Sequence, residues 1–189
     1  MALFRLLVTL GCVITLAGCS PITVSTDYDP SIDFSDYRTY AWLPDLDKRI
    51  ADPQSVDPRI NNTLLDKRVR KAVETHLGAK GYTMVSTDTP DLYVAYHAAL
   101  IGKVDVTTVN RHYGYGPGWR GRGGSIGTET HVREYEEGTL ILDLIDAKTE
   151  SLIWRGLAQA EVWVTSTPEE REKRINEAVR KMLERFPPK

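Results

Sequence analysis

The chain has little cysteine, no long apolar run and no excess of one charge sign. Two cysteines, Cys12 and Cys19, are too few for a fold held by disulfides or for a zinc site of four thiolates. The longest apolar run, residues 6–17, has 12 residues, whereas a helix that crosses a bilayer needs about 20. Lys and Arg number 24 against 26 Asp and Glu, so no nucleic-acid partner is expected.

What is present at the start of the chain is a signal peptide. A positive start with Arg5 and the apolar run precede Leu16-Ala17-Gly18-Cys19, which resembles the bacterial lipobox. We therefore predict a lipoprotein signal peptide over residues 1–18, cleaved before Cys19, which is the predicted lipid-attachment residue. The alternative is a plain secretory signal in which Cys19 is incidental. A cysteine that carries palmitate-like acyl chains would hold a domain firmly on a membrane.

The residue after the lipid-attachment cysteine bears on localisation. It is Ser20 rather than Asp. In lipoproteins that resemble this chain, the lack of a retention Asp implies sorting to the outer membrane. We expect a lipid anchor in the outer membrane, a domain that faces the periplasm, and a tether over residues 19–36.

Two amphipathic helices are predicted in the remaining chain. The first has its N-cap at Asn61 or Asn62, apolar residues on one face and a stop at Gly78 or Gly81. The second begins with the capping sequence 167–170, has an apolar stripe from Ile175 to Phe186, and ends before two prolines.

Strands are predicted where β-branched and aromatic residues alternate with polar ones. The segments are 24–28, 37–43, 82–85, 92–100, 129–136, 140–145 and 152–163, with a hairpin turn over 146–151. Consecutive strands without intervening helices favour an antiparallel or mixed sheet. We predict an α+β fold: a two-layer sandwich whose mostly antiparallel sheet is covered on one face by two amphipathic helices. The single domain is expected over residues 37–189.

Several motifs together resemble one family of bacterial lipoproteins. They are Asp27-Tyr28-Asp29-Pro30, Asp33-Phe34, the segment 37–42, Pro90-Asp91-Leu92, the segments 95–97, 137–147 and 152–156, and the final helix ending at Pro188. With the leader, these resemble the domain of unknown function 4136 family across nearly the whole mature chain. The resemblance implies an envelope lipoprotein with a small α/β domain and brings no agreed catalytic residues.

No segment of the sequence carries a strong pattern of catalytic or metal-binding residues. Ser125 lies in a glycine-rich segment with no following helix, unlike the nucleophile of a hydrolase. Residues that could bind a metal, such as His97, His112 and His131, lack close ligand spacing, so no metal or cofactor is predicted. His97 is expected to be a buried structural histidine, and Asp143 to face solvent or a cross-strand base such as Arg155. Glu134 and Glu136 share a strand face and are interpreted as a solvated edge.

The segment 110–127 carries the one distinctive composition. It contains seven glycines and interleaves arginines with aromatic residues, which can stack on sugar rings or pair with anionic groups. The candidate ligand-contact residues are Arg111, Tyr113, Tyr115, Trp119, Arg120 and Arg122. A flexible loop without a ligand is the alternative.

The sequence thus favours a non-enzymatic interaction or structural module of the cell envelope, with an envelope protein or glycan as partner. The competing hypothesis is a periplasmic hydrolase or glycan-binding protein that uses the loop over residues 111–124.

Overall fold

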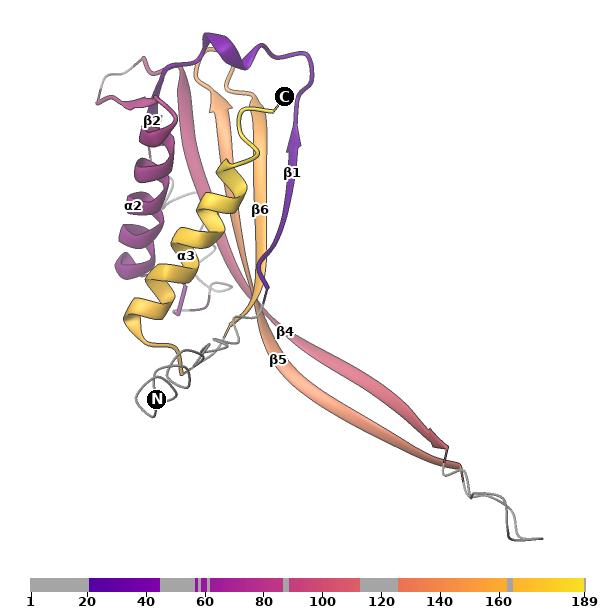
Figure 1. Cartoon of the computed structure of the whole chain (residues 1–189). Helices are drawn as coiled ribbons and strands as arrows, with labels where there is room; N and C mark the ends of the chain where they lie inside the picture. Colours follow the sequence, from indigo (N-terminus) through magenta and orange to yellow (C-terminus); the bar gives the residue numbers. More distant parts are fainter. Residues whose placement is uncertain are drawn as a thin grey trace, which may run out of the picture.

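The computed structural model describes residues 21–44, 57, 59–60, 62–86, 89–112, 126–162 and 165–188. Its strands are β1 (Thr23–Tyr28), β2 (Thr39–Trp42), β3 (Thr83–Met84), β4 (Leu92–His112), β5 (Ile126–Asp146) and β6 (Leu152–Val162). The helices are the short 3₁₀ helix η1 (Phe34–Asp36), α2 (Thr63–Ala79) and α3 (Pro168–Leu183). Figure 1 shows α2 and α3 side by side over one face of the sheet.

The six strands form one mixed sheet in the order β1-β6-β5-β4-β2-β3. Strands β4, β5 and β6 follow one another along the chain and pair antiparallel with their neighbours. Strand β1 pairs antiparallel with β6 at the edge of the sheet. Strand β2 lies parallel to both β3 and β4. The crossover from β2 to β3 contains α2, as parallel pairs require. The predicted α+β sandwich, with a mostly antiparallel sheet under two helices, is confirmed.

Both helices begin at the residues that their caps predict. The side chain of Asn62 accepts hydrogen bonds from the backbone N–H groups of Leu64 and Leu65. Thr167 and Glu170 form a complete capping box at the start of α3. Caps satisfy N–H groups that have no partner within the helix, so they fix where each helix starts. The apolar stripes then face the sheet, with Val73, Leu77, Val179 and Met182 fully buried.

The core lies between the helices and the even-numbered residues of the central strands. Leu92 and Val94 of β4, and Leu142 and Leu144 of β5, have no exposed surface. Trp154 of β6 is also fully buried. Alternate residues of a strand point to opposite faces, so these positions define the covered face and the odd-numbered ones the open face.

Strands β4 and β5 continue far past the rest of the sheet. Their pairing runs from Leu92↔Asp146 to His112↔Ile126, whereas β6 leaves β5 at Glu136 and β2 reaches only Val94. Residues 103–112 and 126–135 thus form a two-stranded ribbon, which we call the arm, and it projects away from the helices (Figure 1).

Three boundaries differ from the sequence expectations. The strands predicted over 129–136 and 140–145 are one strand, because Gly138 and Thr139 pair regularly with β4. Both strands of the arm extend into the loop expected over 110–127. Strand β1 lies within the expected tether over 19–36, where it pairs along β6.

Candidate functional site

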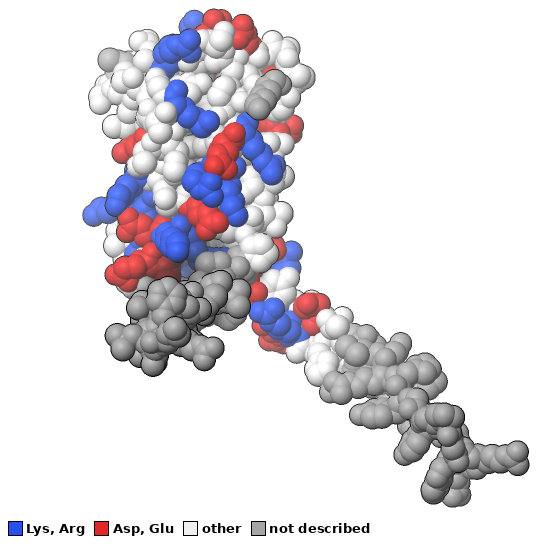
Figure 2. Space-filling model, viewed as in Figure 1, with Lys and Arg blue, Asp and Glu red and all other residues white. Residues whose placement is uncertain are grey.

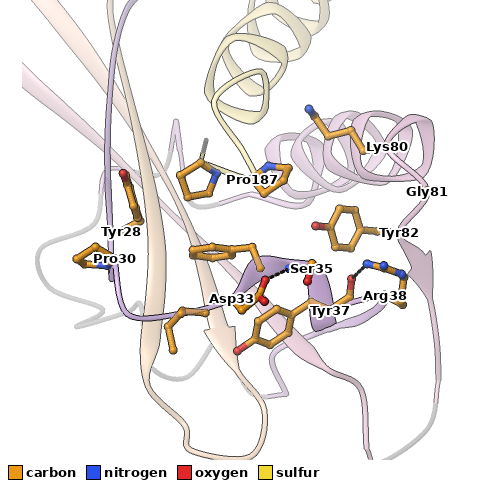
Figure 3. Close-up of a pocket in the computed structure, with 13 residues that line it drawn as sticks. Tyr28, Pro30, Asp33, Ser35, Tyr37, Arg38, Lys80, Gly81, Tyr82 and Pro187 are labelled. Carbon is orange, nitrogen blue, oxygen red and sulfur yellow. Dashed lines mark hydrogen bonds between the residues drawn. The ribbon is translucent and has the colours of Figure 1, made fainter.

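A hollow with a volume of about 850 Å³ lies at the end of the sandwich opposite the arm. The connection from β1 to β2, the turn after α2 and the tail after α3 meet there (Figure 3). Its lining is mainly aromatic and proline, with a few polar groups. The lining residues are Tyr28, Pro30, Ile32, Asp33, Phe34, Ser35, Tyr37, Arg38, Lys80, Gly81, Tyr82, Pro187 and Pro188. We call it the end hollow.

Two aspartates shape the chain that passes over the end hollow. Asp29 Oδ1 accepts hydrogen bonds from the N–H (2.9 Å) and hydroxyl (2.6 Å) of Ser31. Asp33 Oδ1 accepts one from the Ser35 N–H at 2.9 Å and caps η1. Hydrogen bonds from these serines hold the pKa of each aspartate below its ordinary value. Such turns are the usual work of aspartate in irregular backbone, so these carboxylates have a structural role.

A second pair of aspartates fastens the same segment to the sheet. Asp91 Oδ2 accepts hydrogen bonds from the backbone N–H groups of Arg38 (2.9 Å) and Thr39 (2.8 Å), and from the Thr39 hydroxyl (2.8 Å). These bonds lower the pKa of Asp91. Asp146 Oδ2 accepts from the Tyr37 hydroxyl at 2.7 Å. Burial and this carboxylate raise the pKa of Tyr37. Burial of Asp146 opposes its ionisation, but hydrogen bonds from Tyr37 and Thr149 outweigh that and lower its pKa.

An aromatic cluster forms the floor beneath the end hollow. The ring centroid of Phe186 lies 5.6 Å from that of Phe34, 5.5 Å from Tyr82 and 5.3 Å from Trp154. Phe34 also contacts Tyr28, with the ring centroids 6.3 Å apart. Tyr28 is 41% exposed, whereas Phe186 is fully buried. Edge-to-face packing of this kind gives the hollow a fixed floor and leaves one aromatic ring at its rim.

The charged groups of the end hollow do not form a catalytic pair. Asp33 is the one carboxylate among the described residues that line it, and Arg38 and Lys80 are the cations. The guanidinium of Arg38 donates to the Tyr37 carbonyl at 2.8 Å. Glycoside hydrolysis needs two carboxyl groups about 5 to 9.5 Å apart. The described residues of the hollow therefore lack the pair of carboxyl groups that glycoside hydrolysis needs.

The open face of the sheet carries an ion-paired cluster. Arg155 Nε and Nη2 each donate to Asp143 at 2.7 Å, and His97 Nε2 lies 3.7 Å from the same carboxylate. Asp143 is 4% exposed, and the expected pairing with Arg155 is confirmed. The side chain of His97 is 40% exposed, so the expectation that it is buried was wrong. No second layer of described residues covers this face of β4.

A smaller apolar groove, with a volume of about 410 Å³, opens between the first turns of both helices and the sheet. Leu65, Leu100, Leu140 and Ile175 are among the residues that line it. At its rim Arg59 pairs with Glu136 at 2.8 Å. Glu136 is thus held in an ion pair near the base of the arm. Figure 2 shows positive and negative side chains interspersed over the helices on the face drawn, without a field of one sign.

Most of the predicted site residues fall in parts of the chain that the structure does not describe. Cys19, Tyr113, Tyr115, Trp119, Arg120 and Arg122 lie outside the described residues. Arg111 is the penultimate residue of β4, where it pairs with Gly127. Among the residues that are described, no three His, Cys, Asp or Glu side chains gather as a metal ion would require. In the same part of the chain, no helix has both the length and the apolar character to cross a membrane.

Several residues of the end hollow belong to motifs that the sequence analysis noted, but no site was predicted from them. Asp29-Pro30, Asp33-Phe34, Tyr37-Arg38 and Pro187-Pro188 all stood among the motifs of the family resemblance. The structure shows that these separate motifs meet at one end of the sandwich. The sequence alone did not indicate that these motifs lie together, and for this reason the end hollow was not predicted.

The architecture defines the class: an α+β domain in which two helices cover one face of a six-stranded sheet. The chain belongs to the family described as "Domain of unknown function (DUF4136)", which it matches over residues 24–188. No curated protein matches it.

Among the solved structures that resemble the chain, two illustrate the likeness, both at low sequence identity. A PDZ domain protein from Parabacteroides distasonis has a TM-score of 0.53 at 13% identity. That match covers 91% of this chain but only 38% of the other, so it shows the fold of this part alone. The PelC dodecamer from Paraburkholderia phytofirmans has a TM-score of 0.44 at 11% identity, covering 86% of this chain and 95% of that one.

Proposed function

We propose that the chain is a lipoprotein of the bacterial envelope, anchored by acylated Cys19 in the outer membrane, and that its domain is a non-enzymatic interaction module in the periplasm. The lipobox that ends at Cys19 carries the anchoring part of this proposal. Strand β1 begins at Thr23, so the lipid would lie only four residues from the edge of the sheet. Burial of acyl chains supplies about 0.8 kcal/mol per CH₂, so two or more chains are enough for stable anchoring.

The domain's surface supports the interaction role. The end hollow contains aromatic rings and cations but a single carboxylate among its described residues, and Asp143 on the open face is held by Arg155. The arm extends an exposed ribbon away from the core. Exposed strands and rigid aromatic surfaces are typical of protein contact sites.

Metabolic labelling tests the anchor. Cells that express the chain are grown with labelled palmitate, and the envelope is separated from soluble protein. We expect label in the wild-type protein and none in Cys19→Ser, which should leave the membrane fraction. Cys12→Ser is the matched control, because that residue is discarded with the leader, and it should label normally. Firm membrane retention of unlabelled Cys19→Ser would overturn the proposal.

Glycan binding is the second candidate, and the end hollow favours it. Tyr28 presents a ring that is 41% exposed on one side of the end hollow, and Arg38 lines the opposite side (Figure 3). Aromatic rings can stack on sugars and arginine can pair with their carboxylates. Calorimetric titration with soluble peptidoglycan fragments would show binding that Tyr28→Ala weakens. If Trp119→Ala weakens it instead, the glycan binds at the loop that the sequence indicated. No heat with either protein would exclude this candidate.

A further inference from the structure

The outer edge of β4 is unpaired over most of its length. Among the described strands, only β5 pairs with β4 beyond Val94, so from Ala95 onward one edge of a 21-residue strand is open. Long open edges offer rows of N–H and C=O groups to another strand, and most proteins shorten or cover them. This one instead projects clear of the helices (Figure 1).

The arm also exposes apolar side chains on one face. Val104, Val106 and Val132 are 61%, 58% and 62% exposed. They are even-numbered residues and lie on the continuation of the face that the helices cover nearer the core. An exposed cluster of β-branched residues beside an open edge is typical of a strand that is completed by a partner.

We propose that two copies of the chain pair through their arms, with β4 antiparallel to β4 of the second copy and the twofold axis at Val104. In that register Val104 lies opposite Val104 of the second copy, and Val106 opposite Gly102. Lys103, whose Nζ lies 3.0 Å from Glu137 Oε1 of its own chain, stands opposite Asp105 of the second copy, and Asp105 opposite its Lys103. The symmetry thus sets two basic residues opposite two acidic ones. Within one chain Asp105 already lies opposite Arg133, and its carboxylate makes no ion pair with a described residue. Arg133, Asp105 and Lys103 of the second copy would therefore alternate in charge sign over three strands of the ribbon, and Tyr135 of the second copy would stand on the fourth.

Neighbouring registers are less favourable. A twofold axis at Lys103 or at Asp105 would set like charges directly opposite each other, which destabilises a strand pair. Pairing through the free edge of β5 with the axis at Val132 would place His131 opposite Arg133 and Thr130 opposite Glu134, so it would set no acidic residue opposite a basic one. The charge pattern thus favours pairing of β4 with β4 about Val104 over these three alternatives. This inference rests on the proposed interaction role and deepens it by naming a second copy as the partner.

Cysteine crosslinking tests the axis. Opposite residues of an antiparallel pair have Cα atoms about 4.5 or 5.5 Å apart, within disulfide range. In the full chain, purified in detergent and mildly oxidised, Val104→Cys should form a covalent dimer. Val132→Cys is the matched control, being equally exposed on the same face but on the far strand, and should stay monomeric. The wild-type chain reports any background from Cys19. Equal crosslinking of both variants, or none with Val104→Cys, would overturn the proposal.

Charge exchange tests the register. Lys103→Asp and Asp105→Lys should each weaken self-association about tenfold or more, because like charges then oppose each other twice. An equimolar mixture of the two variants should recover the dimer, since one chain then carries two acidic side chains at these positions and the other carries two basic ones. Molar mass by light scattering over a concentration series measures both effects. The proposed dimer would be contradicted if the wild-type chain stays monomeric, or if the mixture of the two variants does not form the dimer again. Palmitate incorporation in the same samples shows separately whether the anchor holds.

Discussion

A Cβ added at either of two glycines in the sheet would lie equally close to a neighbouring side chain, but the two neighbours differ in how freely they can move. A Cβ at Gly156 would lie 2.6 Å from the Trp154 indole and 3.1 Å from Met182 Cβ, and both neighbours are fully buried. At Gly138 the nearest atom is Val162 Cγ2, also at 2.6 Å, but Val162 is 38% exposed and can rotate away. Gly156→Ala should lower the free energy of unfolding by about 1–3 kcal/mol, and Gly138→Ala by less than about 1. Equal losses in urea titrations would contradict this account.

Asp91 should make the fold sensitive to acid. Its folded-state pKa is lowered by hydrogen bonds from Arg38 and Thr39, so its contribution is fully present above the ordinary value of 3.8. That contribution is lost as the pH falls through the lowered folded-state pKa. Asp91→Asn should cost about 2 kcal/mol at neutral pH and flatten the acid slope. Urea unfolding between neutral and acid pH measures both. A variant with the wild-type slope would show that other carboxylates cause the acid sensitivity.

Individual side chains were predictable from the sequence where their partners lie on neighbouring strands of a hairpin. Asp143 and Arg155 are such a pair. The roles of Asp91 and Tyr37 were not predictable, because their partners lie 52 residues (Thr39) and 109 residues (Asp146) away along the chain. No local pattern encodes such contacts.

Among the elements, α3 depends on its cap. The Thr167 side chain accepts from the Glu170 N–H, and Glu170 accepts from the Thr167 N–H at 2.8 Å. Thr167→Ala removes one of these bonds and should lower the free energy of unfolding by about 1 kcal/mol. Thr167→Ser keeps the hydroxyl and should stay near wild type. The two variants are compared by their urea midpoints, and a serine variant as unstable as the alanine one would point to packing of the methyl group instead.

Helix positions were predicted well because caps and apolar stripes are local signals. Strand bounds were predicted closely for β1, β2, β3 and β6, whereas β4 and β5 were predicted too short. The prediction left residues 137–139 outside the strands, yet Gly138 continues β5, and the space that a Cβ would take there is occupied by Val162 Cγ2. Lys103-Val104-Asp105-Val106 still alternates polar and apolar residues, but the side chains of residues 103–107 are exposed on both faces, so pairing with β5 rather than burial determines how far this strand extends.

For the whole molecule, the order of elements was enough to predict two layers, whereas the arm and the end hollow come from long-range pairing. The arm's separation from the core has a thermodynamic consequence. Leu142 and Val132 lie on the same face of β5, one fully buried and the other 62% exposed. At a concentration where the chain is monomeric, Leu142→Ala should cost about 2–5 kcal/mol of unfolding free energy and Val132→Thr less than about 0.5.

Hydrogen exchange should divide β5 in the same way. Backbone amides near Leu142 and Leu144 should exchange only through global unfolding, and those near Arg133 through local opening of the ribbon, because no described layer covers it. Val132→Thr should leave the slow set unchanged. If that substitution instead accelerates exchange at Leu142, the ribbon and the sandwich unfold as one cooperative unit, and the exposed valines would contribute to the stability of the monomer rather than to a contact with another chain.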